Sequence, residues 1–303
     1  MHCRSPQRRR CVILAFALVL GFSIIALGEA SSPVRLGLFT DLHANEGNSP
    51  GEGKVMTNFP ERLTAFVEDM NAWDADLVIQ LGDLINGQYA QMEAYVPIER
   101  FPFILEDVVA ILGGFSGPTY HVIGNHDVYS LSKQELLERT GDASTYYSFD
   151  IGGFHIVVLD AQYTKAGVDL DHAFWVIYGT VPEAQLAWLQ EDLAATDLPT
   201  IVCIHQPLDL ESSSLSPDKP IVTNNVEVKS ALAESGVVVA VFQGHEHENR
   251  YNLIDGIHYV TFQAMVDHTE PTVPAWARIT LDAAIRTITI DGHGDQASLA
   301  LEF

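Results

Sequence analysis

Five short apolar runs in this sequence each end in a cluster of polar residues. The runs have the length and composition of buried strands and cover residues 34–40, 77–81, 120–123, 200–204 and 237–242. Helical patterns lie between most of them, as in βαβ units with a parallel sheet. Active sites of open α/β sheets lie at the carboxyl edge of the strands. We therefore expect the five polar clusters to come together at one edge.

The clusters contain the residue types that bind transition metals. They supply carboxylate and amide oxygens and imidazole nitrogens, but no thiolate, from Asp41, His43, Asp83, Asn125, His205, His245 and His247. This set suits Mn, Fe or Zn better than Ca, and it argues against a structural cysteine-rich zinc site. One such cluster alone could be an ordinary polar turn. Because five clusters occupy equivalent places at strand ends, we predict that they form one shared metal-binding site.

The central cluster, G-N-H-D, also offers a proton donor. His126 can donate a proton near neutral pH, and Asp127 beside it can fix the orientation of the ring. Two metal ions about 3.5 to 4 Å apart could share a hydroxide and clamp a phosphate during in-line attack. A protein that only binds metal or phosphate needs no proton donor at the site. The pair therefore favours an enzyme, with a catalytically silent binding protein as the alternative.

The pattern of elements indicates an α/β fold with two mixed sheets packed face to face and helices outside. A βαβ-like first half is followed by antiparallel strand patterns at 251–254, 257–262, 278–281 and 285–290. Capping boxes, Ser132 with Glu135 and Thr180 with Glu183, indicate two helix starts. Because the sequence shows no internal repeat and no low-complexity linker, we expect one domain over residues 31–303.

The first 30 residues have the pattern of a signal peptide. Four arginines precede an apolar run over residues 11–27, and small residues surround a plausible cleavage point after Ala30. This predicts a secreted or periplasmic protein, with a retained membrane anchor as the alternative. Cleavage would leave Cys203 as the one cysteine, in an apolar run where a buried, inert thiol is expected.

The charge balance limits the partners. The whole chain has a net charge of −24, and removal of four arginines and one glutamate with the first 30 residues gives −27. Such a surface repels nucleic acid and anionic membranes, so we expect no nucleic-acid binding and no stable membrane partner after cleavage. A site for anions must then bring its own positive charge, as metal ions do.

The order of these motifs, D-L-H, G-D, G-N-H-D, H and G-H-E-H, resembles that of the calcineurin-like metallophosphoesterases. The resemblance implies a sandwich of two sheets between helices and a dinuclear metal centre. In that centre Asp41, His43 and His247 would hold one ion, and Asn125, His205 and His245 the other. Asp83 would bridge the ions, and His126 would lie beside the scissile phosphate.

Several further stretches are similar to the manganese-dependent ADP-ribose and CDP-alcohol diphosphatases. They are A-F-V-E-D-M-N, L-G-D-L-I-N-G, G-N-H-D-V-Y-S-L-S, Y-Y-S-F and Q-L-A-W-L. His43 differs, because that subgroup tends to carry Gln there while the wider family carries His. The resemblance implies two Mn ions, with Fe, Zn or Co as substitutes, and a small phosphate ester or nucleotide-type substrate.

The alternative of a phosphomonoesterase would require extra cations to hold the second phosphate charge. Basic residues near the motifs are few, namely Lys54, Arg62, Lys133, Arg139 and Lys165. We therefore expect a phosphodiester or nucleoside-diphosphate-type bond to be cleaved. The aromatic loop from Tyr163 to Tyr178, which includes Trp175, is the expected cover for a base or sugar.

Overall fold

The computed structural model describes residues 32–48, 54–87, 96–173, 176–210, 221–266 and 273–303. Residues 31–303 form one compact unit. The predicted signal peptide and Trp175 lie outside the described residues, so the expectations for them stay predictions. No helix in the described ranges is both long and apolar enough to cross a membrane.

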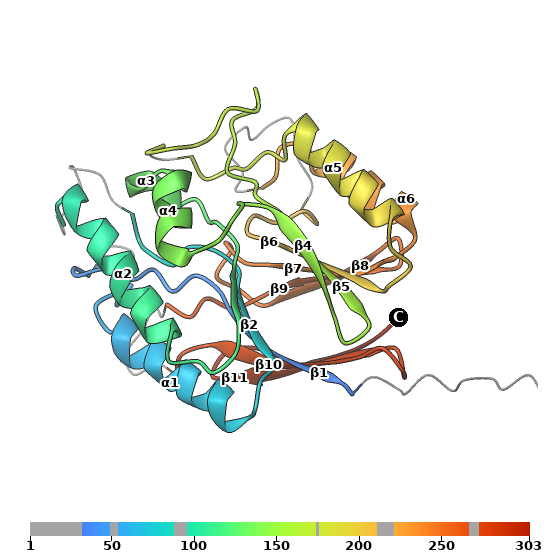
Figure 1. Ribbon diagram of the computed structural model, residues 1–303, viewed down its shortest axis with the longest axis horizontal. Helices are drawn as coiled ribbons and strands as arrows, with labels where there is room; N and C mark the ends of the chain where they lie inside the picture. The colour runs from blue at the N-terminus through green and yellow to red at the C-terminus, as the bar shows by residue number, and fades with distance from the viewer. Residues whose placement is uncertain (1–31, 49–53, 88–95, 174–175, 211–220, 267–272) are drawn as a thin grey trace, which may run out of the picture. The chain divides into compact units, whose positions relative to one another are not determined.

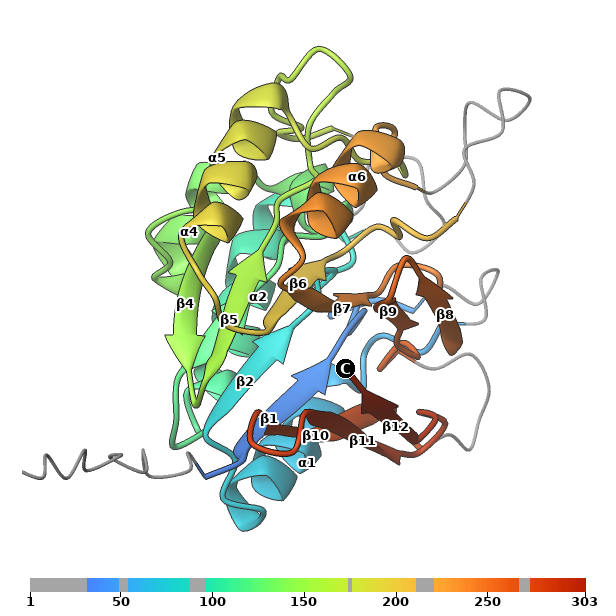
Figure 2. The ribbon, with the colours of Figure 1, turned by 90° about the vertical axis from the view of Figure 1, so that its right-hand side faces the viewer.

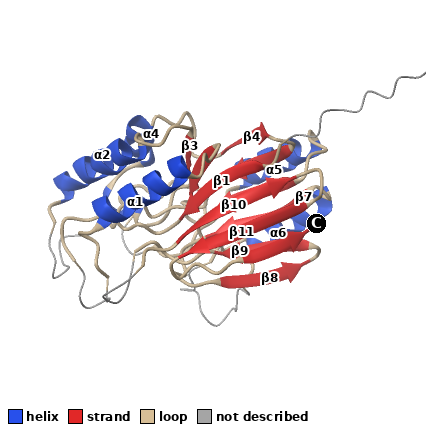
Figure 3. Ribbon diagram, turned by 90° about the horizontal axis from the view of Figure 1, so that it is seen from below, coloured by secondary structure: helices blue, strands red, loops and turns tan. Residues whose placement is uncertain are grey.

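The first sheet has six strands in the order β12-β11-β10-β1-β2-β3. β1, β2 and β3 are parallel, and the last three strands of the chain add to the β1 edge in antiparallel fashion. The strands are β1 (Val34–Phe39), β2 (Leu77–Gln80), β3 (Thr119–His121), β10 (Trp276–Asp282), β11 (Thr287–His293) and β12 (Leu299–Glu302). Figure 3 shows β1, β10 and β11 side by side.

The second sheet has six strands in the order β4-β5-β6-β7-β9-β8. Its four central strands are parallel, and an antiparallel strand closes each edge. The strands are β4 (Tyr147–Ile151), β5 (Phe154–Val158), β6 (Thr200–Ile204), β7 (Val238–Gln243), β8 (Arg250–Ile254) and β9 (Ile257–Thr261). Figure 2 shows β5, β6 and β7 of this sheet beside β1 and β2 of the first.

Helices cover the outer faces of both sheets. The helices are α1 (Phe59–Ala72), α2 (Phe101–Leu112), α3 (Asp127–Ser130), α4 (Lys133–Thr140), α5 (Glu183–Ala194) and α6 (Asn225–Ser235), with the 3-10 turn η2 (Ile98–Arg100) before α2. α1 and α2 pack on the first sheet, and α5 and α6 pack on the second (Figure 1). The predicted α/β class with two mixed sheets between helices is confirmed.

The alternation of side chains along the strands explains these layers. In β1, Leu36 and Leu38 point into the cluster between the sheets, whereas Phe39 belongs to the cluster beneath α1 and α2. In β6, Ile201 and Cys203 face the other sheet, and Val202 and Ile204 face α5 and α6. Because a strand sends successive side chains to opposite faces, apolar residues on both faces require cover on both sides. Cys203 is buried and free, as predicted.

Two predictions about local structure need correction. The expected capping box at Thr180 is absent: α5 begins after Pro182 without a side-chain cap, and the Thr180 hydroxyl lies 2.7 Å from that of Thr223. The other box, Ser132 with Glu135, is formed at α4. β12 was not expected, because its short and half-exposed sequence lacks a strong strand pattern. It adds the last strand to the first sheet.

Candidate metal centre

Five of the predicted ligand residues have left-handed backbone conformations. Their φ angles are 53° at Asp41, 48° at His43, 56° at Asp83, 73° at His245 and 56° at His247. Positive φ is uncommon for residues with a Cβ atom and costs of the order of 1 kcal/mol or more each. All five lie in the short segments after strands β1, β2 and β7. Backbone strain is therefore concentrated where the polar clusters lie.

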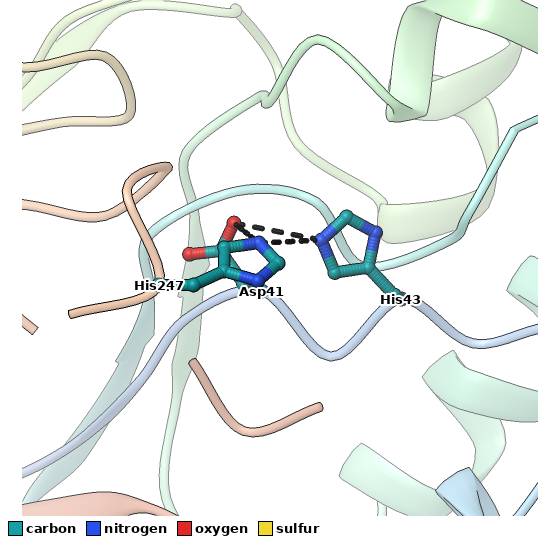
Figure 4. A group of neighbouring side chains, drawn as sticks. All are labelled: Asp41, His43 and His247. Atoms are coloured by element: carbon teal, nitrogen blue, oxygen red, sulfur yellow. Dashed lines mark hydrogen bonds and ion pairs between the residues drawn. The ribbon is translucent and has the colours of Figure 1, made fainter. Parts of the chain in front are cut away.

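The first group of ligands consists of Asp41, His43 and His247 (Figure 4). The Nε2 atoms of His43 and His247 are 3.0 Å apart. Asp41 Oδ1 lies 3.2 Å from the nitrogen of His247 and 3.7 Å from that of His43. The other oxygen of Asp41 is held by the Thr40 hydroxyl at 2.6 Å and by the backbone N–H of His245 at 3.0 Å. One carboxylate oxygen is thus fixed, and the other faces the imidazoles.

The second group consists of Asp83, His205 and His245. Asp83 Oδ2 is 3.3 Å from His205 Nε2, and that nitrogen is 3.2 Å from His245 Nδ1. The same oxygen lies 3.7 Å from His43 Nε2 of the first group. Asp83 therefore stands between two clusters of ligand atoms, which is the place that a bridging carboxylate requires.

Hydrogen bonds behind the site set the tautomers of two histidines. His43 Nδ1 is 2.9 Å from the side-chain oxygen of Asn86, and His205 Nδ1 is 2.7 Å from the backbone oxygen of Leu81. Both partners can only accept a hydrogen bond, so each Nδ1 carries the proton. In both rings Nε2 is then the nitrogen that faces the cluster and that a metal ion would bind.

Asn125 is held in a comparable way. Its amide nitrogen donates to the Tyr129 hydroxyl at 2.8 Å. Its amide oxygen is buried and has no hydrogen-bond donor among the described residues. A buried acceptor without a partner is costly in a folded protein. A cation at the site would satisfy this oxygen.

The protonation states also suit a cation. Burial opposes ionisation of Asp41 and Asp83, but the neighbouring imidazoles hold the pKa of each carboxyl well below its usual range. Burial lowers the pKa of His43 to about 4 and that of His245 to about 3. Burial also opposes protonation of His205, yet the charge of Asp83 raises its pKa to about 9. The negative charges of the two carboxylates thus favour a cation at the site, and the neutral imidazoles of His43 and His245 can coordinate it.

His126 lies at the partly exposed side of the cluster. Its ring centroid is 4.6 Å from that of His43, and the two rings meet edge to face. Its backbone N–H donates to Asp83 Oδ1 at 2.8 Å. Burial lowers the pKa of its imidazole well below the usual range. The predicted proton donor is therefore placed beside both groups of ligands.

The structure gives Asp127 a different role from the predicted one. Its carboxylate accepts the backbone N–H groups of Asp83 at 3.0 Å, Gly124 at 2.9 Å and Ile85 at 3.1 Å. Because these bonds take both oxygens toward the backbone, the carboxylate does not orient the His126 ring. Asp127 instead fastens the segment after β2 to the segment after β3.

Two glycines allow the polar clusters to approach one another. A Cβ atom on Gly124 would lie 2.1 Å from Asp83 Oδ1, and one on Gly244 would lie 2.1 Å from the Thr40 hydroxyl oxygen. Any larger residue would push Asp83 or Thr40 out of place. Gly124 and Gly244 are therefore required by close packing behind the ligands.

Three residues behind the ligands were not predicted, namely Thr40, Asn86 and Tyr129. Each contacts a predicted ligand through its side chain. Asn86 and His43 are far apart in the sequence, and nothing in the sequence pairs them. Tyr129 lies four residues after Asn125, which is the spacing of neighbours on a helix, and this spacing was an available signal.

The sequence profile of the family described as calcineurin-like phosphoesterase matches residues 34–249. A manganese-dependent ADP-ribose/CDP-alcohol diphosphatase of Oryza sativa subsp. japonica is 27% identical over 229 residues, which cover 62% of this chain and 68% of that protein. A probable cyclic nucleotide phosphodiesterase of Fibrobacter succinogenes is 25% identical over 232 residues, which cover 75% of this chain and 78% of that protein.

A solved structure has the same fold. The crystal structure of a dimetal phosphatase from Danio rerio superimposes with a TM-score of 0.75 at 21% identity. The match covers 90% of this chain and 100% of that one. The two-sheet architecture and its flanking helices are thus shared with that protein.

Proposed function

Because the chain belongs to the calcineurin-like phosphoesterase family, we propose that it hydrolyses a phosphodiester or nucleoside-diphosphate-type bond with two metal ions at this site. Membership makes it a metal-dependent phosphoester hydrolase. The position of Asp83 carries the proposal for two ions, because its Oδ2 lies close to a nitrogen of each ligand group.

The predicted ligands divide between the two ions as their contacts suggest. Asp41, His43 and His247 would hold one ion, and His205, His245 and the unpartnered oxygen of Asn125 the other. Asp83 would serve both. Manganese is the proposed ion, since oxygen and imidazole ligands suit it and the named diphosphatase relatives depend on it. When bound, such ions acidify a water as the nucleophile and neutralise charge on the phosphate oxygens.

His126 supplies the remaining chemistry. Its ring stands next to both ligand groups on the partly exposed side, where a leaving group can reach it. A protonated ring nitrogen would donate to the leaving oxygen as the bond to phosphorus breaks. The Tyr129 ring lies against this ring, with the centroids 4.7 Å apart and the planes tilted by 43°, and limits its movement. The backbone bond to Asp83 keeps the donor at a fixed place relative to the ligands.

The loop from Tyr163 to Tyr178 is proposed to cover the substrate. The Ala173 N–H donates to the carbonyl of Val128 at 3.0 Å, and the Tyr129 hydroxyl donates to the carbonyl of Val176 at 3.5 Å. Both contacts place the loop against α3, which directly follows His126. A base or sugar on the scissile phosphate would extend toward this loop. The loop thus supports a substrate larger than a simple phosphomonoester.

The test is a comparison of substrates on one preparation of the protein. We expect chelation to abolish activity and Mn to restore it, and we expect ADP-ribose or CDP-choline to give a higher kcat/KM than 4-nitrophenyl phosphate. A cyclic nucleotide belongs in the panel because of the Fibrobacter relative. Full activity of the metal-free protein would contradict the mechanism. A clear preference for the monoester would contradict the substrate class.

We also propose that the protein is exported and that residues 1–30 are removed. The arginines, the apolar run and the small residues before Ser31 support this. Amino-terminal sequencing of protein from the native host should begin near Ser31 in a fraction outside the cytoplasm. An intact amino terminus in a membrane fraction would instead identify an anchor.

A further inference from the structure

A pair of buried glutamines joins two segments that carry predicted ligands. Gln162 lies shortly after β5 and Gln206 shortly after β6, and both side chains are fully buried. Their amides bond to each other twice: Gln162 Nε2 donates to Gln206 Oε1 at 2.7 Å, and Gln206 Nε2 donates to Gln162 Oε1 at 3.1 Å. Because a buried amide is costly unless its donors and acceptors are paired, these bonds hold the two side chains in one arrangement.

The amide of Gln162 also reaches the first sheet. Its nitrogen donates to the backbone oxygen of Ile123 at 3.0 Å, so both of its N–H donors are used. Ile123 lies between β3, which belongs to the first sheet, and Asn125. Gln206 directly follows His205, at the end of β6 in the second sheet. The amide pair is therefore a hydrogen-bonded link between the segment that carries Asn125 and the segment that carries His205.

The same two segments are packed closely at Gly82, which follows β2. A Cβ atom on Gly82 would lie 2.5 Å from His205 Nδ1 and 2.9 Å from the backbone nitrogen of Gly124. The ends of three strands from two sheets thus meet at one place. Since Asn125 and His205 come from different sheets, the distance between their ligand atoms depends on how the sheets are joined there.

Gln162 is itself fixed through its backbone. Its N–H donates to Asp160 Oδ1 at 2.7 Å, and its carbonyl accepts the N–H of Leu170 at 3.0 Å. Asp160 is fully buried, and the ammonium of Lys133 lies 2.7 Å from its other carboxylate oxygen. Because the backbone is held on both sides, the Gln162 side chain extends from a defined place toward the two segments that it links.

Two other buried glutamines at strand ends make their described contacts within a single sheet. Gln80, at the end of β2, donates to the carbonyl of Val122 after the neighbouring strand β3 at 2.7 Å. Gln243, at the end of β7, donates to the Thr261 hydroxyl on β9 at 3.0 Å and accepts the N–H of Leu208 after β6 at 3.0 Å. The amide pair differs from both because it connects the two sheets.

We propose that Gln162 and Gln206 are positioning residues for the second metal ion, the one assigned to Asn125, His205 and His245. This inference rests on the proposed function, which places two ions at the site. The link sets the spacing of the Asn125 and His205 segments before an ion binds, so binding needs little reorganisation. The amide oxygen of Asn125 and Nε2 of His205 are the ligand atoms that it holds in relation to each other. Residues that support metal ligands from behind change metal affinity about 10- to 100-fold when they are replaced.

The experiment titrates the metal-free protein with Mn by calorimetry and compares Gln162→Leu and Gln206→Leu with the wild type. Both variants should bind the second ion about 10- to 100-fold more weakly and should bind the first ion as the wild type does. Asn125→Ala removes a proposed ligand and so identifies the binding step that belongs to the second ion. Because the link acts on the spacing to Asn125, adding Gln162→Leu to Asn125→Ala should cause no further loss.

Melting temperatures separate positioning from a general loss of stability. Gln185→Leu is the matched control, because Gln185 is equally buried and its amide bonds to the backbone N–H and carbonyl of Asp160 at 2.9 and 2.7 Å. It should lower the melting temperature and leave both Mn affinities unchanged. The double variant Gln162→Leu/Gln206→Leu leaves neither amide without its partner, so it should melt no lower than Gln162→Leu. It should still bind the second ion weakly.

The outcomes distinguish the inference from the proposed function. Unchanged affinity of Gln162→Leu for both ions, in a protein whose wild type binds two, would overturn the inference and leave the proposed function standing. An equal weakening of the second ion by Gln185→Leu would also overturn it, since the effect would then follow stability alone. A wild type that binds a single ion would overturn the two-ion centre. The inference would then hold only if Gln162→Leu and Asn125→Ala both weakened that ion.

Discussion

The interior between the two sheets and the edge that carries the predicted ligands both contain fully buried side chains, but they are built from opposite kinds of residue. Between the sheets, side chains such as Leu36, Ile156 and Ile201 are fully buried, aliphatic and part of regular strands. At the edge, Asp41 and His205 are equally buried but ionisable. Five residues at the edge also have left-handed backbones.

The difference separates stability from function in this fold. Aliphatic burial stabilises the protein by about 25 cal/mol per Å² of apolar surface. Buried ionisable groups and positive φ angles cost free energy unless a ligand compensates them. The stabilising burial between the sheets therefore offsets the free-energy cost of the residues at the edge. Substitutions at the edge should change activity and metal content, and substitutions between the sheets should change the free energy of unfolding.

The largest effect is expected from Asp83→Asn. This change removes the charge of Asp83, which lies close to both ligand groups, so both ions should bind more weakly. Activity should fall by more than the roughly 10²- to 10⁴-fold expected for a single acid–base group. Asp41→Asn, which affects one group, serves as the matched variant and should lose less. Mass spectrometry of bound metal checks the result, and retention of two ions in Asp83→Asn would contradict the bridging role.

His126→Ala should have the next largest effect at the edge. The ring is predicted to donate a proton, so turnover should fall roughly 10²- to 10⁴-fold while metal content stays near normal. The loss should shrink on esters with good leaving groups, which need little protonation. Asp127→Asn is a useful contrast, because the structure assigns it to backbone fastening. If His126→Ala lost its metals, the ring would have to be counted among the ligands.

Between the sheets, Ile156→Ala should show the reverse pattern. Ile156 is fully buried on β5 and far in sequence from every predicted ligand. Its truncation should lower the free energy of unfolding by about 2 to 5 kcal/mol, as for other large-to-small changes in a core. The kcat of the folded protein should not change. Urea unfolding and steady-state kinetics together measure both, and a stable but inactive variant would break the separation drawn here.

The parts of this design that could be predicted are those with a local pattern. Short continuous apolar runs identified the strands, and the polar residues after them identified the ligands that the structure brings together, from Asp41 to His247. The rest depends on pairs of residues far apart in the sequence. The contact of Asn86 with His43 and the backbone contacts of Asp127 arise only when the strands lie side by side. Their residue types are ordinary in turns, so the sequence alone could not assign them.

The smallest effect is expected from His155→Gln, which tests a buried histidine that is not at the edge. His155 Nδ1 is 2.6 Å from Asp150, and its Nε2 is 2.9 Å from Asp192 on α5. Burial opposes protonation, but the two carboxylates raise the pKa of His155 above its usual value of 6.5. The contribution to stability should therefore be fully present below about pH 6.5 and be lost as the pH rises through the raised pKa.

Ion pairs of this partly exposed kind are worth about 0.2 to 1 kcal/mol, so the melting temperatures of His155→Gln and wild type should differ by a few degrees at most at pH 6 and converge at pH 9. Activity should not change, because the described partners of this histidine, Asp150 and Asp192, are not predicted ligands. A difference in melting temperature that grew with pH would show that His155 is neutral in the folded protein.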